Sequence, residues 1–266
     1  SSDLICRINP TSGGDIFFKG QKINGKISKE LDKEVIRKIQ MIFQDPYSSL
    51  NPRMSVYDTI AEMLRVHKVV PAEELPARVE QLLTMSGLTM DIAERFPGEF
   101  SGGQRQRIGI ARALSLNPAF IVADEPVSAL DVSIQAQIIN LLAQLQRELE
   151  LTVLFISHDL RVVRHITHRV MVMYLGSNVE VGPTEAIFQH PAHPYTQVLT
   201  KAAPKLDPLN RQRDYAIEGE PPSPIHTPTG CKFHPRCPYC TDKCRSEVPE
   251  LKEIAPGHLC ACHYPL

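Results

Sequence analysis

The sequence lacks any apolar run long enough to cross a lipid bilayer. A span needs about 18 consecutive apolar residues, and none occurs in the 266 residues. Net charge is nearly absent too, because 29 Lys and Arg oppose 30 Asp and Glu to leave −1. No overall field therefore directs the chain to nucleic acid or anionic lipid. Trp is missing, while 42% hydrophobic and 22% charged residues are typical of a globular protein.

Cysteine is scarce through most of the chain. Only Cys6 precedes the last 36 residues, where the other six fall between Cys231 and Cys262. Since the rest of the sequence is typical of a cytosolic protein, this clustering favours metal binding over disulfides. The length allows one large domain, or one domain with an appendage.

Hydrophobic periodicity indicates a parallel α/β core. The pattern predicts a β-hairpin at 13–25, a helix leading to a strand in 35–46, helices in 55–90 interrupted at Pro71 and Pro76, a strand at 119–126, a helix at 133–150, a strand at 151–159 and two strands in 169–182. From about residue 190, Pro and His become frequent and the periodicity fades. Ligands of parallel sheets bind beyond the carboxyl ends of the strands.

A Ser-Gly-Gly-Gln turn precedes a helix with apolar spacing. Ser101, Gly102, Gly103 and Gln104 would present backbone N–H groups beside the positive end of the helix dipole. Such a turn is suited to binding an anion. The same residues are equally consistent with a capped helix after a flexible turn.

Acidic, amide and imidazole side chains follow three apolar strands. Asp124 and Glu125 have a Walker B arrangement, in which Asp124 would hold Mg²⁺ and Glu125 would polarise the attacking water. The alternative is a pair that caps the next helix. His158 is suited to contact a γ-phosphate, or is an ordinary loop histidine. Gln44 is a candidate ligand of metal and water, or a plain amide at a strand end.

In their order and spacing, "FQDP", "SGGQRQR", "ADEPVSALD" and "SHD" closely resemble the Q-loop, signature, Walker B, D-loop and H-loop of an ABC transporter ATPase subunit. "QMIFQDPYSSLNPRMSV", "VEVGPTEAIFQHPAHPYTQVL" and "GCKFHPRCP" further resemble the oligopeptide/dipeptide importer group. The resemblance implies an ABC-type P-loop NTPase core over 1–190: a parallel sheet with flanking helices, an antiparallel hairpin region and a helical signature subdomain at about 50–115. A small irregular Cys-rich tail, 191–266, would follow as the extension of this group.

A phosphate-loop pattern at Gly20–Ile27, "GQKINGKI", is interpreted as a decoy. Ile27 lacks the hydroxyl that Mg²⁺ needs at the last position of G-x-x-x-x-G-K-[ST]. In the ABC family, a hairpin like "PTSGGDIFFKGQKI" follows the helix after the phosphate loop. We therefore expect the true loop just before residue 1, through truncation, unless the subunit is naturally degenerate.

The resemblance implies two such subunits arranged head to tail, with ATP and Mg²⁺ between the phosphate loop of one and the signature of the other. Asp131 would help join the two sites, and the segment after Gln44 would face a coupling helix of the membrane partner. The expected partners are a second ATPase, two transmembrane permease subunits and an extracytoplasmic solute-binding protein, without nucleic acid. The second ATPase is expected to be a paralogue, because the importer group usually pairs two different ATPases. The chain would lie peripherally on the cytoplasmic face of the cell membrane.

Four cysteines are the candidate metal ligands of the tail: Cys231, Cys237, Cys244 and Cys262. Four thiolates suit Zn²⁺ or an iron–sulfur cluster, and the spacing alone does not choose. The resemblance favours a [4Fe–4S] cluster, with Zn²⁺ as the second choice. Cys240 and Cys260 are extra thiols, and reduced cysteines without a ligand are the remaining alternative.

Two rival functions are open at this point. One is a soluble ABC-type ATPase acting on DNA or ribosomes, which the tail position of the cysteines and the short stretch between Gln44 and Ser101 disfavour. The other is a subunit that donates its signature and does not hydrolyse ATP. The basic run at Arg105–Arg107 is interpreted as a solvated helix face or a surface packed on the partner, since two Arg without interleaved aromatics are weak support for nucleic-acid binding.

Overall fold

The computed structural model describes residues 2–202, 220, 222–223 and 225–266, and it forms two compact units, Ser1–His158 and Asp159–Leu266. The boundary predicted at residue 190 falls inside the second unit. The reason is strand pairing, because β7 (Ser177–Pro183) lies beside β9 (His258–Cys260) from the tail.

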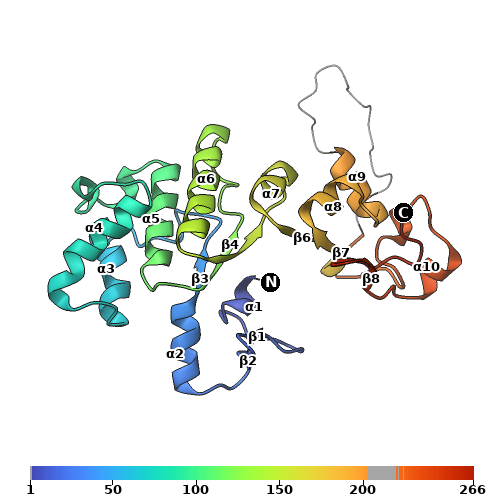
Figure 1. Ribbon diagram of the computed structural model, residues 1–266, viewed down its shortest axis with the longest axis horizontal. Coiled ribbons are helices and arrows are strands. Elements are labelled where there is room, and N and C mark those ends of the chain that lie inside the picture. The colour runs from blue at the N-terminus through green and yellow to red at the C-terminus, as the bar shows by residue number, and fades with distance from the viewer. Residues whose placement is uncertain (1, 203–219, 221, 224) are drawn as a thin grey trace. The chain divides into compact units, whose positions relative to one another are not determined.

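The first unit contains a β-hairpin, a parallel sheet and a group of helices. Its strands are β1 (Phe17–Phe18), β2 (Gln21–Lys22), β3 (Ile39–Ile42), β4 (Phe120–Asp124) and β5 (Thr152–Ile156), and its helices are α1 (Ser2–Ile5), α2 (Lys29–Lys38), α3 (Val56–Val66), α4 (Leu75–Met85), α5 (Gly102–Leu114) and α6 (Val132–Glu148). The strand order β3-β4-β5 is parallel throughout, which confirms the predicted core. The helices α3, α4 and α5 pack on one another (Figure 1).

The second unit is built around a four-stranded antiparallel sheet in the order β6-β7-β9-β8. Its remaining elements are β6 (Arg169–Tyr174), β8 (Lys252–Ala255), α7 (Leu160–Ile166), α8 (Thr184–Gln189), α9 (Pro194–Ala202) and α10 (Asp242–Ser246). The prediction that the tail is irregular is wrong for residues 252–260. These residues add two strands to the sheet that β6 and β7 begin.

Local sequence signals explain where several elements start. Ser28 and Ser55 cap α2 and α3, and the hydroxyl of Ser55 accepts from the backbone N–H of Asp58 at 3.1 Å. Pro71 separates α3 from α4, as predicted. Pro76 does not interrupt a helix. It lies in the first turn of α4, where its missing N–H would have no helical partner anyway.

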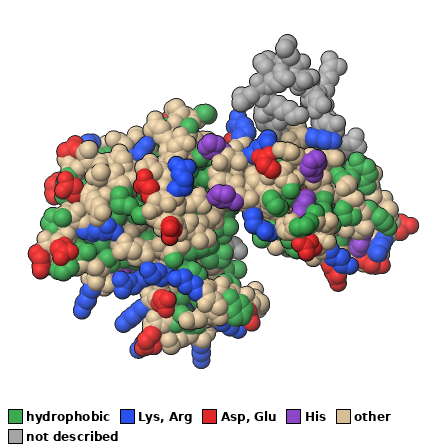
Figure 2. All heavy atoms as spheres, viewed as in Figure 1, with side chains coloured by type: hydrophobic (Ala, Val, Ile, Leu, Met, Phe, Trp, Pro, Cys, Tyr) green, Lys and Arg blue, Asp and Glu red, His purple; other side chains and the backbone are tan. Residues whose placement is uncertain are grey.

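Burial in each unit follows the sheet. Within β4, Ile121, Val122 and Ala123 are buried, as expected for a strand covered on both faces. Exposed and buried residues alternate along β6, so only one face of its sheet is covered. None of the described helices is long and apolar enough to cross a bilayer. On the face seen in Figure 2, acidic and basic side chains both occur on each unit, in keeping with the small net charge.

Candidate functional site

The carboxylate of Glu125 lies between side chains from both neighbouring strands. Gln44 follows β3 and donates from Nε2 to one Glu125 oxygen at 2.9 Å. His158 follows β5, and its Nδ1 lies 3.2 Å from the other oxygen. The sequence reasoning placed these three side chains at strand ends, and the parallel order of β3, β4 and β5 brings them together.

The backbone at Glu125 is held in an uncommon conformation. Its φ is +44°, in the left-handed region that residues with a Cβ rarely occupy. The N–H of Glu125 donates to the carbonyl of Ile156 at 3.0 Å, and its carbonyl accepts from the hydroxyl of Ser128. Such backbone strain concentrates at functional sites, where the surrounding structure maintains it. The adjacent strand and turn thus fix the direction of this carboxylate.

Asp124 has a partner that the sequence reasoning missed. The hydroxyl of Ser2, at the start of α1, donates to Asp124 Oδ2 at 2.5 Å. Ser2 is buried, so the contact is shielded from water. A hydroxyl beside a carboxylate offers two oxygen ligands of the kind that Mg²⁺ takes. The only sequence signal was a serine immediately before a short helical stretch.

The predicted phosphate-loop decoy lies in the hairpin. Gly20 is in the turn between β1 and β2, with φ +78°, and Gln21–Lys22 form β2 itself. The following residues, 23–28, connect the hairpin to α2. The hairpin predicted at 13–25 is confirmed.

The signature turn is a capping box at the start of α5. The hydroxyl of Ser101 accepts from the N–H of Gln104 at 3.4 Å, and the Gln104 side chain accepts from the N–H of Ser101 at 3.0 Å. A Cβ on Gly103 would come 2.4 Å from Ile134 in α6, and one on Gly102 would come 3.1 Å from Leu130. The two glycines therefore also let α5 pack closely on its neighbours.

The remaining residue predicted to contact the nucleotide, Asp131, is exposed at the N-cap of α6. Within the described part of the chain, no hydrogen bond links the signature turn or Asp131 to the Glu125 carboxylate. The structure therefore separates the predicted residues into a strand-end group and a signature group.

The interpretation of the basic run as a solvated or partner-facing surface is wrong for Arg105. This side chain is buried, donates from Nε to the carbonyl of Pro97 at 2.6 Å and stacks 3.5 Å from the ring centre of Tyr47. Arg112, further along α5, donates to the carbonyl of Ser49. Two arginines of the signature helix thus bind the segment that follows Gln44.

A surface cleft of about 320 Å³ lies just beyond that segment. It is lined by Arg53, Met54, Asp58, Glu62, Arg65 and Val66. Val66 is 68% exposed. The cleft thus presents apolar and charged side chains of both signs next to the stretch predicted to face a coupling helix.

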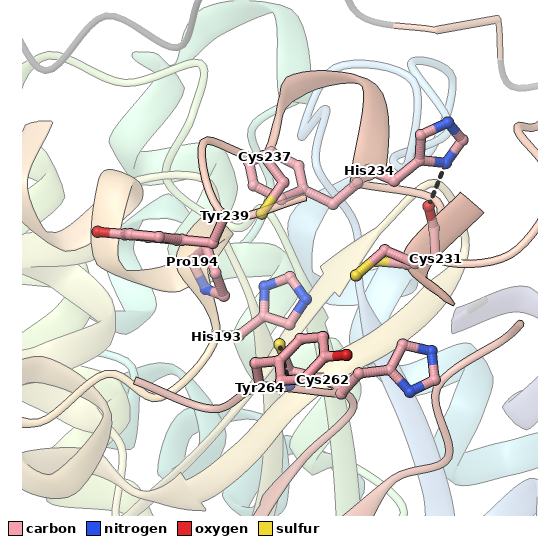
Figure 3. Close-up of a pocket in the computed structure, with 11 residues that line it drawn as sticks. His193, Pro194, Cys231, His234, Cys237, Tyr239, Cys262 and Tyr264 are labelled. Carbon is pink, nitrogen blue, oxygen red and sulfur yellow. Dashed lines mark hydrogen bonds between the residues drawn. The ribbon is translucent and has the colours of Figure 1, made fainter. Parts of the chain in front are cut away.

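In the second unit, four cysteines from three segments line one small pocket, which we call the thiol pocket: Cys231, Cys237, Cys244 and Cys262 (Figure 3). These are the four predicted ligands. Cys240 does not line it, and Cys260 lies on β9. All seven cysteines of the chain are free thiols. Among the described residues, no three His, Cys, Asp or Glu side chains lie close enough together to hold one metal ion.

The thiols of the pocket affect one another electrostatically. Burial raises the pKa of Cys237 to about 11, and the neighbouring thiols of Cys262, Cys231 and Cys244 add to the rise. Burial likewise raises the pKa of Cys262, with Cys244 contributing. Thiolates would repel one another here, and a bound cation would relieve that repulsion.

Backbone contacts hold the arms of the thiol pocket together. The N–H of Cys231 donates to the carbonyl of Cys244 at 2.8 Å. Gly230 has φ +64°, and a Cβ there would come 2.5 Å from the same carbonyl. Phe233 is 1% exposed and packs against Tyr174 and Tyr195. The thiols thus lie on a packed framework.

A buried carboxylate joins β7 to the tail. Glu180 is fully buried and accepts from the N–H groups of Ala192 and His193 at 2.8 and 2.9 Å. Its third partner is the ring Nε2 of His258 on β9, at 2.7 Å. The sequence reasoning assigned no role to His258, and a lone Glu in a strand gives no signal of these partners.

Family models match both parts of the chain. A model described as ABC transporter matches residues 2–128, and one described as oligopeptide/dipeptide transporter, C-terminal region, matches residues 179–244. Among curated proteins, the oligopeptide transport ATP-binding protein AppF of Bacillus subtilis is 52% identical over 262 residues, 97% of this chain and 79% of its own. The di/tripeptide transport ATP-binding protein DppF of Pseudomonas aeruginosa is 47% identical over 255 residues, 96% and 78% of the two chains.

A solved structure shares the fold. The ATP-binding cassette MJ0796, in a dimeric post-hydrolysis state with ADP and Pi, superposes with a TM-score of 0.61 at 30% identity. The superposition covers 69% of this chain and 78% of that one.

Proposed function

The chain belongs to the ABC transporter ATPases, among the ATP-binding subunits of oligopeptide and dipeptide importers, and from this membership and its site geometry we infer how it works. It is an ATP-hydrolysing subunit that powers the import of peptides or related small solutes through a membrane ABC transporter. The single observation that supports the chemistry best is the Glu125 carboxylate, contacted on its two oxygens by Gln44 and His158.

In the proposed mechanism, Glu125 orients and polarises the water that attacks the γ-phosphate. Gln44 and His158 hold the carboxylate in place, and each has further polar atoms to contact water or phosphate. Asp124 and Ser2 would hold Mg²⁺, which neutralises phosphate charge during the transfer. Ser2 thus takes the place of the hydroxyl ligand beside a Walker B carboxylate.

A second ATPase subunit would complete the nucleotide site. The Ser101–Gln104 turn would contact the ATP bound to the partner, since its N–H groups lie at the start of a 13-residue helix. Asp131 would link the two sites across the interface. The dimeric relative with ADP and Pi supports a paired arrangement, and we propose a paralogue as the second subunit.

The contact with the membrane partners would run through the segment after Gln44. Arg105 and Arg112 bind this segment to the signature helix. A displacement of the segment would therefore also displace the signature helix. The adjacent cleft of about 320 Å³ would receive a short helix of a permease subunit. The full assembly would contain two permease subunits and an extracytoplasmic solute-binding protein, with this chain at the cytoplasmic face of the membrane.

Both rival functions have less support. The relatives named above are peptide transport ATP-binding proteins, and they match nearly the whole chain. This similarity disfavours an ATPase acting on DNA or ribosomes. A subunit that only donates its signature would have no need of the Gln44–Glu125–His158 arrangement.

For the thiol pocket we propose a [4Fe–4S] cluster held by Cys231, Cys237, Cys244 and Cys262. Four thiolates are the ligand set of such a cluster, and the four thiols line one small pocket. Zn²⁺ is the second choice, and no three described His, Cys, Asp or Glu side chains are grouped closely enough to hold one metal ion. The group would cross-link three segments of the tail.

The test of the ATPase assignment is Glu125→Gln in the assembled transporter. We expect ATP to bind while hydrolysis and peptide uptake are lost, because the amide cannot accept a proton from water. Glu73→Gln, at an exposed position outside the site, is the matched control and should leave ATP hydrolysis and peptide uptake unchanged. Hydrolysis by the Glu125→Gln transporter at the wild-type rate would refute this role of Glu125.

A further inference from the structure

Gln135 binds the backbone on both sides of Asp131. Its side-chain Nε2 donates to the carbonyl of Leu130 at 2.8 Å, and its backbone N–H donates to the carbonyl of Asp131, also at 2.8 Å. These carbonyls belong to the two peptide groups that flank the Asp131 Cα, so the two bonds together fix the direction of its Cα–Cβ bond. Gln135 lies near the start of α6 and is half-buried. The proposed hydrolysis step does not use this side chain.

The carboxylate of Asp131 is left available for another partner. An aspartate at an N-cap usually accepts a hydrogen bond from an N–H group in the first turn of its helix. Asp131 occupies the N-cap of α6 and makes no such bond. In the parts of the chain that the structure describes, its carboxylate has no other hydrogen bond or ion pair. Asp131 is exposed and its neighbour Val132 is 79% exposed, so a second subunit could reach both.

The turn that ends at Asp131 begins at the catalytic carboxylate. The hydroxyl and the N–H of Ser128 both donate to the carbonyl of Glu125, at 3.0 and 3.2 Å. Near the end of the turn, the side chain of Leu130 lies against the signature turn. The helices that follow these two turns, α5 and α6, pack on each other (Figure 1). The turn is thus anchored at its start by Ser128 and at its end by Gln135.

We propose that Gln135 is a positioning residue of the shared ATP site, because its amide fixes the Leu130–Asp131 peptide and so directs the Asp131 carboxylate toward the second subunit. The proposal rests on the proposed function, in which each ATP lies between two ATPase subunits. A carboxylate that is already held in one direction loses little freedom when the subunits close. Without the amide, the peptide can rotate and only a fraction of the molecules present Asp131 correctly. The apparent affinity for ATP then falls by that fraction.

Two substitutions at Gln135 remove the donor in different ways. Gln135→Met keeps a long unbranched side chain but cannot donate to the Leu130 carbonyl. Gln135→Glu keeps the shape of the side chain and places a carboxylate oxygen where the amide nitrogen lies. Gln144→Met is the matched control, because Gln144 is exposed on the same helix and its amide donates only to the Glu148 side chain.

The measurement is steady-state ATP hydrolysis by the assembled transporter as a function of ATP concentration. We expect both Gln135 variants to raise the KM for ATP about tenfold. The maximal rate should change less than about twofold, because transporters that do close have an intact Glu125. Gln144→Met should behave as wild type. The urea midpoint of the chain should hardly move in any variant, because the lost bond lies in a partly exposed turn.

A double-mutant cycle shows whether Gln135 acts through Asp131. Asp131→Ala alone should raise the KM for ATP at least as much as either Gln135 variant. In the Asp131→Ala background, Gln135→Met should add a factor of less than about two, because the carboxylate that the amide positions is already gone.

Several results would overturn the proposal. A wild-type KM in both Gln135 variants does so, as does a full further rise in the Asp131→Ala background. A wild-type KM in Gln135→Glu alone would show that side-chain shape matters and the donor does not. A clearly lower urea midpoint in both Gln135 variants would assign the effect to folding. If Asp131→Ala has a wild-type KM, the role of Asp131 between the subunits fails too, while Glu125→Gln alone decides the ATPase assignment.

Discussion

The strand-end group of the first unit and the thiol pocket of the second contrast in their openness. The His158 side chain is 74% exposed and that of Glu125 26%, and their hydrogen bonds are to one another and to Gln44. In the thiol pocket, Cys244 is 7% exposed and His193 1%, and the thiols of Cys231, Cys237 and Cys262 are partly buried. An open group of polar side chains suits a ligand that comes and goes with each turnover. A more buried group of thiols suits a ligand that stays bound.

This contrast has a consequence for mutations. Substitutions in the strand-end group should change turnover and leave folding nearly intact, since exposed polar contacts contribute little to stability. Substitutions around the thiol pocket should act on the folding of the second unit, because they alter packed and buried groups.

The largest effect is expected for His158→Ala in the strand-end group. Loss of a group that orients the Glu125 carboxylate should reduce ATP turnover about 100-fold, the scale found for one polar stabilising group in an active site. The melting temperature should hardly change. Steady-state phosphate release from the assembled transporter measures ATP turnover, and calorimetry measures the melting temperature. His165→Ala, at an exposed position on α7, is the control; a His158→Ala protein that turns over normally but melts early would reverse the contrast.

Gly230→Ala should have the next largest effect, in the thiol pocket. The new Cβ would meet the carbonyl of Cys244 at 2.5 Å, at a residue whose φ of +64° already disfavours any side chain. We expect unfolding of the second unit to become easier by about 1–3 kcal/mol, measured by urea denaturation. Gly257→Ala is the matched control, because its φ is +70° but the nearest contact is 3.6 Å. Equal losses in the two variants would show that backbone conformation, and not the close approach, is responsible.

Arg105→Lys tests whether a buried contact of the first unit also couples ATP hydrolysis to transport. The contact is the stacking of Arg105 on Tyr47 in the segment after Gln44. Lysine cannot stack its head on Tyr47 as a guanidinium does. We expect about 1–2 kcal/mol lower stability and more ATP hydrolysed per peptide transported, measured in proteoliposomes. Tyr47→Ala should behave alike, and Tyr47→Phe, which keeps the ring, should behave as wild type. An unchanged ratio of hydrolysis to uptake in Arg105→Lys would leave the stacking a purely structural contact.

The smallest effect is expected at Asp159, the residue after His158. Its side chain accepts from the N–H of Arg161 at 2.9 Å and pairs with the guanidinium at 2.8 Å, and the Arg161 hydrogen bond lowers the pKa of Asp159. A lowered folded-state pKa gives stability that is present above the unfolded value and is lost as pH falls through the folded one. Asp159→Asn should cost about 0.5 kcal/mol at pH 7 and less at pH 2. Urea midpoints at the two pH values decide this, and a loss that is as large at pH 2 as at pH 7 would count against the charge.

The sequence placed the members of the strand-end group at strand ends because the signals for a strand end are local. Gln44, Glu125 and His158 each follow an apolar strand. Because the three strands are parallel neighbours, their carboxyl ends lie side by side and bring these side chains together. Arg105 was misjudged because its stacking partner, Tyr47, lies far back in the chain. A basic residue in a helix carries no local sign of burial. Ser2 was missed for a similar reason, since its partner Asp124 lies 122 positions away.

The second unit was predicted less completely. The four cysteines stand out by residue type alone, and the structure places them on one pocket. The strands β8 and β9 have only four and three residues and no clear alternation, so periodicity does not detect them. The network of Glu180 with His193 and His258 depends on the pairing of β7 with β9, which no local pattern reveals.

The bond between Glu180 and His258 spans 78 positions of the chain, and this separation matters while the protein is being made. At about 5–20 residues per second, the ribosome adds the second partner roughly 4–16 s after the first. For that time β7 has an open edge and its buried carboxylate lacks the imidazole partner, and an open strand edge invites pairing with another chain. Slow codons placed between the two would lengthen this exposure. The yield of the protein should therefore depend on the speed of its translation as well as on its residues.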